Sequence, residues 1–408
     1  MPYLPLELLL NVVHSPELSG HDLRQLRAVN RTFHNLVCRD AFRKVAVTAT
    51  VKSANGLLNI LGTPAISTYV QEIESQEDMP PIGDDQDPAG VRAGMKQGGP
   101  QDWSELQSIM ASAYSLLHQA PALHSIVFRF SPIFKEDARD YDDFEPSDEL
   151  QLHWAMLGAI ANNPIPLPAL RSLALHNMLP FPGDTDDDDI YDTKPFAKIV
   201  GALHHLHICA LGEELAEDAY HQDPLQNFWE QVLLRLLEPA KELRSLHIGS
   251  NIWVGAMPPL EFTLLAYPRL ESLCLDGVLF DGQLPVVGTE DFVARHGKTL
   301  RRLELVGCAI THGFQIPERF WSMIWRRYEQ ELELLSELIV EFHREDPDSV
   351  RESPRTEPLL RYCVFLDGQG FIPDFVDVPG EEEDTAALSS LQAVVAGRRA
   401  ATSSASTE

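Results

Sequence analysis

The sequence predicts an α/β protein in which a three-helix N-terminal module precedes an irregular solenoid of βα units with a parallel, concave sheet. The first observation is that the pattern LxxLxL recurs along the chain, with the alternation expected of a strand that buries its leucines. The second is that segments with helical periodicity lie between the copies. We expect the module over residues 1–47, the solenoid over residues 48–378 and a disordered tail over residues 379–408.

Composition excludes several classes of protein. The chain of 408 residues has 61 acidic and 32 basic side chains, and its formal net charge of -29 repels nucleic-acid phosphates and anionic lipid. The five cysteines are scattered without a CxxC pair, which indicates neither a disulfide framework nor a zinc ribbon. No basic segment precedes the apolar run LPLELLLNVV, and no stretch offers the roughly 18 uncharged apolar residues of a membrane span. We expect a cytoplasmic or nuclear protein without nucleic-acid or membrane partners.

The N-terminal module begins with that apolar run. Its pattern predicts three short helices over residues 5–13, 21–29 and 32–44. Forty-odd residues cannot bury a sufficient core alone, so the module must pack against the solenoid, against a partner, or against both. Its apolar side chains could form the centre of an interface, or they could close the end of the solenoid as a terminal cap does.

The repeats supply the strands of the predicted sheet. Clear copies of the pattern begin at Leu123, Leu170, Leu203, Leu243, Leu270 and Leu300, and weaker copies begin at Leu335 and Leu360. Helical segments between them include residues 104–119, 226–237 and 317–335. Repeated βα units stack into a curved solenoid because each unit buries its leucines against its neighbours. The spacing of 25 to 47 residues is irregular, so an ordinary α/β sheet with leucine-rich strands remains the alternative.

The two parts of the chain resemble two known families. LPLELL, DLRQLRAV and NRTFHNLV resemble an F-box in all three helices, with Pro16 departing from the apolar residue that usually closes the first helix. The repeats are similar to a degenerate form of the leucine-rich repeat family over roughly residues 66 to 370. The chain thus resembles the F-box proteins with degenerate repeats that are common in fungi. The F-box match runs through Leu4, Pro5, Glu7, Leu8, Leu23, Leu26, Arg27, Val29, Arg31, Phe33 and Leu36.

The resemblance implies a function. In the F-box family the apolar face of the three helices binds the small Skp adaptor, which is held by a cullin scaffold in an SCF-type (Skp–cullin–F-box) ubiquitin ligase. The repeat domain would then bind an unknown protein substrate. The alternative is a non-catalytic repeat scaffold without a role in ubiquitin transfer. The adaptor-binding residues that the resemblance and the apolar pattern suggest are Leu4, Pro5, Leu8, Val12, Leu23, Leu26, Val29, Phe33 and Leu36.

No sequence motif indicates an enzyme. The chain has no GxSxG, HExxH or phosphate-binding GxxxxGK[ST] pattern. The acidic run DTDDDDIYD has the spacing of a calcium loop but carries Asp189 and Pro195 where that loop needs glycine and glutamate. We therefore predict no catalytic residue, no metal site and no cofactor.

Strand alternation predicts a cluster of histidines. The residues between the leucines face the side of the sheet opposite to them, which places His176, His205, His207 and His247 together on the concave side. Such a patch can contact a substrate as a polar surface, and it can also bind a metal or respond to pH.

Acidic and apolar segments follow successive strands. In a βα solenoid the loops after the strands leave by the same rim, so the acidic segments 74–90, 136–149, 184–192 and 212–218 should share one edge. The later loops are apolar, and we expect Trp253, Leu279 and Phe280 to anchor the substrate there, while the acidic edge attracts a basic segment of it. The alternative is that the acidic loops only solubilise the protein.

Overall fold

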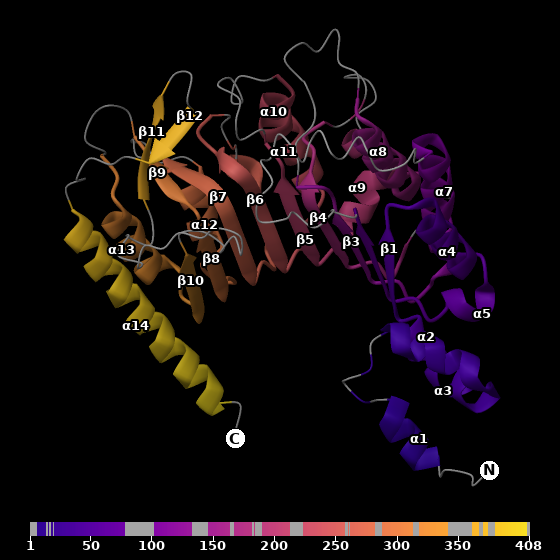
Figure 1. Cartoon of the computed structure of the whole chain (residues 1–408). Helices are drawn as coiled ribbons and strands as arrows, with labels where there is room; N and C mark the ends of the chain where they lie inside the picture. The colour runs from indigo at the N-terminus through magenta and orange to yellow at the C-terminus, as the bar shows by residue number, and fades with distance from the viewer. Residues whose placement is uncertain are drawn as a thin grey trace, which may run out of the picture. The chain divides into compact units, whose positions relative to one another are not determined.

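In the computed structural model the protein has an α/β fold whose strands are mostly parallel (Figure 1). Two compact units divide the chain. Unit 1 comprises Met1–Ile82, Gln86–Ser131 and Gln151–Leu173, and unit 2 comprises Gly83–Asp85, Pro132–Leu150 and Ala174–Glu408. The structure describes residues 6–13, 15, 18, 20–77, 102–132, 146–163, 167–181, 183, 190–212, 223–257, 260, 262–281, 288–312, 318–341, 361–366, 370–373 and 380–405.

Unit 1 begins with three helices at the N-terminus. They are α1 (Leu6–Val13), α2 (Gly20–Val29) and α3 (Arg31–Ala41), which agree closely with the predicted helices. Asn30 starts α3 because its side-chain Oδ1 accepts a hydrogen bond from the backbone N–H of Phe33 at 3.0 Å.

The rest of unit 1 alternates strands and helices. The strands β1 (Lys44–Thr48), β2 (Glu72–Gln76) and β3 (Ser125–Arg129) form a parallel ladder in the order β1-β2-β3. The helix α4 follows β1 in the chain, α7 follows β2, and the two helices pack against each other. The helices of this region are α4 (Val51–Leu61), α5 (Pro64–Ser67), α7 (Trp103–Ser115), the 3-10 turn η2 (Leu117–Gln119) and α8 (Asp148–Ala161), of which residues from Gln151 onwards belong to unit 1.

The leucines of the repeats form continuous rows in unit 2. Leu206, Leu246, Leu273 and Leu303 are register partners on four successive parallel strands, and all four are buried. The prediction that these leucines point into the core is therefore confirmed for this ladder. Its strands begin with β4 (Ser172–Met178), which lies beside β5 and belongs to unit 2 from Ala174 onwards. The others are β5 (His205–Ala210), β6 (Ser245–Val254), β7 (Ser272–Asp281), β8 (Arg302–Val306) and β10 (Glu337–Glu341).

A second ladder continues from the far part of β7. There β9 (Ala309–Thr311) pairs with β7, β11 (Arg361–Leu366) pairs with β9, and β12 (Gly370–Pro373) pairs antiparallel with β11. Helical elements connect the strands of unit 2: η5 (Ile190–Asp192), α9 (Lys194–Gly201), α10 (Asp223–Asn227), the π-helical turn η7 (Phe228–Val232), α11 (Leu233–Leu237), η8 (Phe262–Leu264), α12 (Thr289–Arg295) and α13 (Trp321–Glu331).

The expected disordered tail is wrong for most of its length. Residues Glu381–Ala405 form α14, a helix that packs against α13 and β10 within unit 2. The cause is an apolar stripe, because Leu388, Leu391 and Val395 recur at helical spacing and are all buried. The charged and small residues around that stripe give the segment the composition of a disordered tail.

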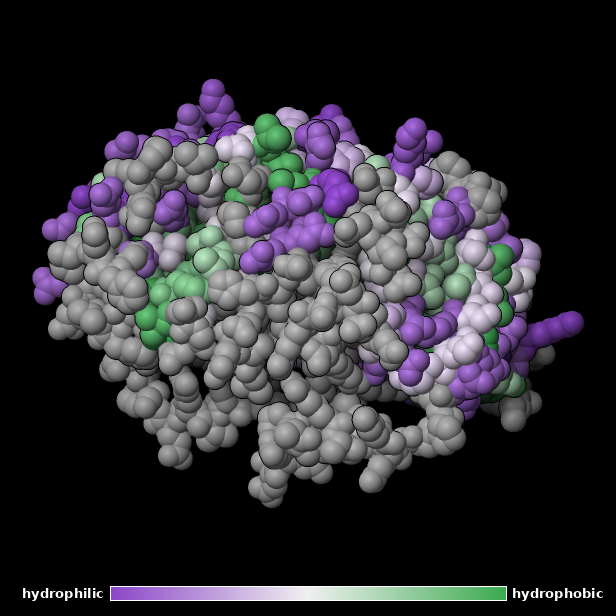
Figure 2. Space-filling view, turned by 90° about the horizontal axis from the view of Figure 1, so that it is seen from above, coloured by the Kyte–Doolittle hydropathy of each residue, from purple (hydrophilic) through white to green (hydrophobic). Residues whose placement is uncertain are grey.

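The surface is mixed in character. Figure 2 shows one side of the molecule, on which hydrophilic and hydrophobic side chains of the described residues are interspersed. Leu264 in η8 is 84% exposed and is the most exposed of the large hydrophobic residues in the described part of the chain. Single exposed apolar residues of this kind are common on soluble proteins and indicate no site by themselves.

Candidate protein-interaction surfaces

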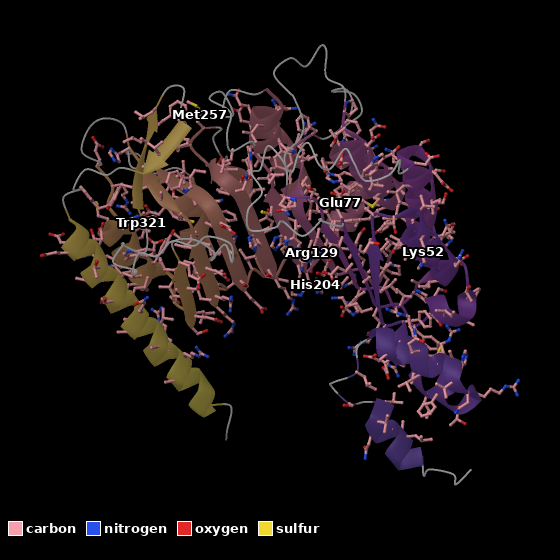
Figure 3. All side chains as sticks on the ribbon, in the orientation of Figure 1. Lys52, Glu77, Arg129, His204, Met257 and Trp321 are labelled. Carbon is pink, nitrogen blue, oxygen red and sulfur yellow. The ribbon has the colours of Figure 1, made fainter. Side chains whose placement is uncertain are left out.

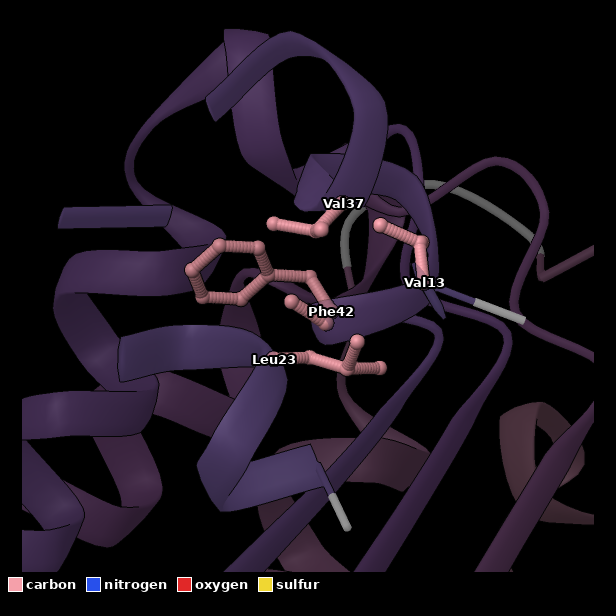
Figure 4. Close-up of a cluster of buried hydrophobic side chains, with 5 residues drawn as sticks. Val13, Leu23, Val37 and Phe42 are labelled. Carbon is pink, nitrogen blue, oxygen red and sulfur yellow. The ribbon is translucent and has the colours of Figure 1, made fainter. Parts of the chain in front are cut away.

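The three N-terminal helices share a small core of their own. Val13 from α1, Leu23 from α2 and Val37 from α3 are buried together with Ala41 and Phe42 (Figure 4). This cluster explains why the short helices hold together, since each contributes at least one side chain to it.

Arg27 adds a polar link between the helices. Its Nε donates a hydrogen bond to Nδ1 of His34 at 3.3 Å, and its guanidinium lies 4.9 Å from the centre of the Phe42 ring. The first contact joins α2 to α3, and the second joins α2 to the residue that follows α3. Both help to hold the two helices together.

The core of the module also includes residues of the first βα unit. Ile60 in α4 and the α5 residue Ile66 pack against the buried cluster. Residues on both sides of position 47 therefore share one core, as expected for a segment too short to be stable by itself. The module thus packs against the region that follows it, which is one of the two possibilities that the sequence indicated.

The predicted adaptor-binding residues fall into two groups. Val12 is 49% exposed and Val29 is 63% exposed, so both can reach a partner directly. Leu23 is buried in the module core, and Leu26, Phe33 and Leu36 are half-buried against it. Leu23 therefore stabilises the module core and is not exposed to contact a partner. Leu4 and Pro5 lie outside the described residues, and for Leu8 the structure describes only the backbone, within α1.

Three of the four predicted histidines stack in a row on unit 2. The ring centres of His176 and His207 lie 4.0 Å apart, and those of His207 and His247 lie 3.8 Å apart. His207 and His247 are register partners on β5 and β6. We call His176, His207 and His247 the histidine ladder. His205 is exposed and stands one row away from it, opposite Ser245.

The ladder ends beside a thiol and a carboxylate on β7. Nε2 of His247 lies 3.8 Å from Sγ of Cys274 and 3.9 Å from Oδ2 of Asp276. Gly249 makes room for this pair, because a Cβ atom at that position would lie 2.9 Å from Cβ of Asp276 and 3.3 Å from Nε2 of His247. Cys274 and Asp276 were not singled out from the sequence, although the register of the repeats places them beside β6.

The ladder does not have the arrangement of a metal site. No group of three or more His, Cys, Asp or Glu side chains among the described residues is placed to hold a metal ion. Neighbouring imidazole rings are tilted against one another by 43° and 39°, whereas metal ligands direct their nitrogen lone pairs at a common point. That these histidines form a polar contact surface for a substrate stays a prediction.

Two of the three predicted apolar anchors are buried. Leu279 is 1% and Phe280 is 0% exposed, and the Phe280 ring packs 5.0 Å from that of Trp321. The expectation that Leu279 and Phe280 anchor a substrate is wrong in this conformation, because β7 continues through them into the second ladder and turns both into core. Trp253 is half-buried, and its indole Nε1 donates to the carbonyl oxygen of Gly307 at 2.6 Å.

Side-chain hydrogen bonds fix the chain at the start of two of the acidic segments, after β2 and after β5. In unit 1, Glu77 follows β2 and accepts a hydrogen bond at Oε2 from the backbone N–H of Ser131 at 2.6 Å (Glu77 is labelled in Figure 3). Its Oε1 lies 3.0 Å from Nε2 of His153 in α8. In unit 2, Asn251 exchanges two hydrogen bonds with the backbone of Gly212, at 2.7 and 2.9 Å. Sequence reasoning missed Glu77, His153 and Asn251, since only the strand pairing brings each to its partner.

The acidic segments themselves are mostly outside the described residues. This holds for the larger part of 74–90, 136–149, 184–192 and 212–218. Within each unit, the strands that precede these segments belong to parallel ladders, so successive carboxyl ends lie on one edge of each ladder. That all four segments share a rim stays a prediction.

Comparison with known proteins adds no relative. Neither the models of protein families nor the curated proteins include a match to this sequence. In the described part of the chain, no helix combines the length and the apolar character needed to cross a membrane.

Proposed function

We propose that the chain is the substrate-recognition subunit of an SCF-type ubiquitin ligase, with the three N-terminal helices binding the Skp adaptor and the repeat region binding the substrate. The observation that carries the proposal is that the three helices share a buried core and leave two valines, Val12 and Val29, exposed. The F-box resemblance suggests both valines as adaptor-binding residues, which sets them apart from exposed apolar residues that occur singly elsewhere, such as Leu264.

The energetics favour Val12 and Val29 as contact residues over Leu23. Because about half of Val12 and about two thirds of Val29 are exposed, each valine would gain on the order of 1 to 2 kcal/mol from full burial, before the costs of association. Leu23 is already buried, so its contribution to binding would come through the shape of the module. Leu26, Phe33 and Leu36 are half-buried and can contribute their remaining exposed surface.

Aspartate substitutions at the two valines test the proposal. Val12→Asp and Val29→Asp place a carboxylate where the adaptor would exclude water, which should weaken adaptor binding by several kcal/mol. Because both side chains are exposed, the free protein should remain folded. Leu264→Asp is the matched control, since it makes a similar change at a position that is more exposed and belongs to unit 2.

Binding of the purified chain to the Skp adaptor can be followed by calorimetry. The proposal expects tight binding by the unmodified chain and by the Leu264→Asp protein, and strongly reduced binding by the two valine variants. Retention of adaptor binding by both valine variants would remove this surface from the proposal. Absence of binding by the unmodified chain would remove the ligase function itself.

A scaffold without a role in ubiquitin transfer is the second candidate. It is favoured by the contacts of Ile60 and Ile66 with the module core, because a module fused to the first repeat resembles a terminal cap. Affinity purification of the full chain from its native host distinguishes the two functions. Recovery of both adaptor and cullin supports the ligase subunit, and recovery of other proteins without them supports the scaffold.

A further inference from the structure

The face of the unit 2 sheet that carries the histidine ladder has an excess of negative charge. Opposite the leucines, Asp276 on β7, Glu304 on β8, and Glu337 and Glu341 on β10 alternate with the buried positions. Arg302 on β8 is the one guanidinium in these rows of β7, β8 and β10, and it pairs with Glu304 at 3.0 Å and with Glu337 at 2.5 Å. Four carboxylates against one guanidinium leave this described part of the face acidic, in keeping with the net charge of -29 on the whole chain.

The ladder lies directly beside this acidic region. His207, His247, Cys274 and Glu304 are register partners on four successive strands. The row therefore runs from the imidazoles through a thiol to a carboxylate of the acidic region. Arginine and lysine side chains carry only donors and positive charge, which makes them the complementary groups.

Protonation of His247 would weaken the attraction of arginine and lysine side chains to this part of the row. Histidine ordinarily gains its proton near pH 6.5. His247 is the ring best placed to take it, because its Nε2 lies 3.9 Å from Oδ2 of Asp276. A charged His247 would offset the carboxylate of Asp276 and repel an incoming cation. Titratable neighbours in the described strands are His176 on β4, His207 and Cys209 on β5, and Cys274 on β7.

We propose that this face binds an arginine- or lysine-bearing segment of the protein that the chain recruits, and that binding weakens as the pH falls through the range where histidine is protonated. The inference rests on the proposed function, since it names the chemistry of the recruited partner. An acidic or phosphorylated segment would meet like charges at Asp276 and Glu304, and it would bind more tightly at low pH, when the imidazoles are charged.

Peptide binding to the full chain tests the proposal. Fluorescence anisotropy would compare an alternating arginine–serine peptide with the matching glutamate–serine peptide, at constant ionic strength, at about pH 7.5 and about pH 5.5. We expect the arginine peptide alone to bind, and to bind about fivefold more weakly at the lower pH, the effect of losing one partly exposed ion pair.

Two pairs of variants locate the binding. Asp276→Asn combined with Glu304→Gln should weaken binding of the arginine peptide, whereas Glu238→Gln combined with Glu333→Gln removes the same charge from exposed positions elsewhere and should not. His247→Gln should flatten the pH dependence, because glutamine cannot become a cation that offsets the Asp276 carboxylate at the lower pH. His205→Gln, one row away, should leave the dependence intact.

Equal weakening by both charge-removing pairs would show general attraction to an acidic protein and would overturn the proposal. Preference for the glutamate peptide, or binding that tightens at low pH, would overturn it as well. Adaptor binding is measured on the same proteins. A chain that binds the arginine peptide at this face but binds no adaptor would leave the surface standing and remove the ligase function.

Discussion

Asp384 in α14 accepts a hydrogen bond at Oδ1 from the backbone N–H of Ser322, in the first turn of α13, at 2.6 Å. Its other oxygen accepts from the hydroxyl of Tyr362 at 2.6 Å. The residue before α13 is Phe320, whose side chain cannot cap a helix, so the cap comes from a residue distant in the sequence. At the other end of α13, Arg398 donates to the carbonyl oxygens of Leu332 and Glu329. α14 thus places an acid at the positive end and a base at the negative end of its neighbour.

Asp384→Ala should lower the free energy of unfolding by about 2 kcal/mol, because it leaves the N–H of Ser322 and the hydroxyl of Tyr362 without this acceptor. Chemical denaturation followed by tryptophan fluorescence measures the change, since Trp321 and Trp325 lie in α13. Glu383→Ala is the control, because Glu383 makes only a 4.0 Å contact with Arg326 and both side chains are exposed. Equal losses in the two variants would contradict the capping role.

The case of α14 shows where composition misled the prediction. EEED, GRR and TSSASTE are typical of disordered tails, yet the stripe of Leu388, Leu391 and Val395 within the segment was enough to form a packed helix. Its partners on α13 and β10 could not be identified from local sequence. The clear repeats were the opposite case, because the LxxLxL spacing sets both the strand and the face that its leucines bury.

The candidate surfaces were predictable where they depend on strand register and unpredictable where they depend on tertiary packing. Strand alternation placed His207 beside His247, because it depends only on register. Leu279 and Phe280 were mistaken for exposed anchors because β7 runs on past the repeat pattern into the second ladder. The exposure of Val12 and Val29 depends on how three helices pack, which a local pattern does not determine.

Glu290 in α12 should be the most costly carboxylate to remove in its neighbourhood. It is buried, with Nε of Arg319 donating to its Oε2 at 2.8 Å and Nη1 of Arg327 donating to its Oε1 at 3.0 Å. Glu290→Ala removes the carboxylate that Arg319 contacts, whereas Arg327 keeps its ion pairs with Asp291 and Glu331, and it should destabilise the fold by about 3 kcal/mol. Glu271→Ala, which breaks the exposed 3.5 Å contact with Arg244, should cost less than about 1 kcal/mol in the same denaturation experiment. Comparable losses would argue against a structural role for the buried network.

His296 should make stability depend on pH. Burial lowers the pKa of this imidazole, whose Nε2 accepts from the backbone N–H of Tyr267 at 3.0 Å and whose Nδ1 lies 2.7 Å from the carbonyl oxygen of Phe292. Because its pKa in the folded state is below the unfolded value of about 6.5, the unfolded state binds more protons in this range. The stability that His296 contributes is therefore fully present above about pH 6.5 and is lost as the pH falls through its folded pKa.

The His296→Gln protein provides the measurement. Its deficit in unfolding free energy relative to the unmodified chain should be largest near neutral pH and should shrink on acidification. His205→Gln is the control, since it makes the same replacement at an exposed position. A deficit that stays constant with pH would mean that the His296 ring is required for packing alone.

Two glycines in unit 2 should respond in opposite ways to the same substitution. At Gly249 a new Cβ would lie 2.9 Å from Cβ of Asp276 and 3.3 Å from Nε2 of His247, closer than real Cβ contacts allow, so the strand or the pair must move. Gly249→Ala should therefore cost about 1 to 3 kcal/mol, as overpacking does. At Gly397, in an exposed turn of α14, a Cβ would meet no atom within 4 Å, and Gly397→Ala should stabilise the fold by about 0.5 to 1 kcal/mol through helix propensity.

The two alanine variants also separate the geometry of the ladder from its chemistry. Gly249→Ala keeps every histidine and carboxylate but displaces His247 from Asp276, so the imidazole proton signal of His247 should titrate differently by NMR while the leucine rows remain buried. Gly397→Ala should leave that titration unchanged. If Gly249→Ala altered neither the stability nor the His247 titration, the close approach of β6 and β7 at this point would be wrong, and with it the pairing of His247 with Asp276 on which the pH dependence of the binding face depends.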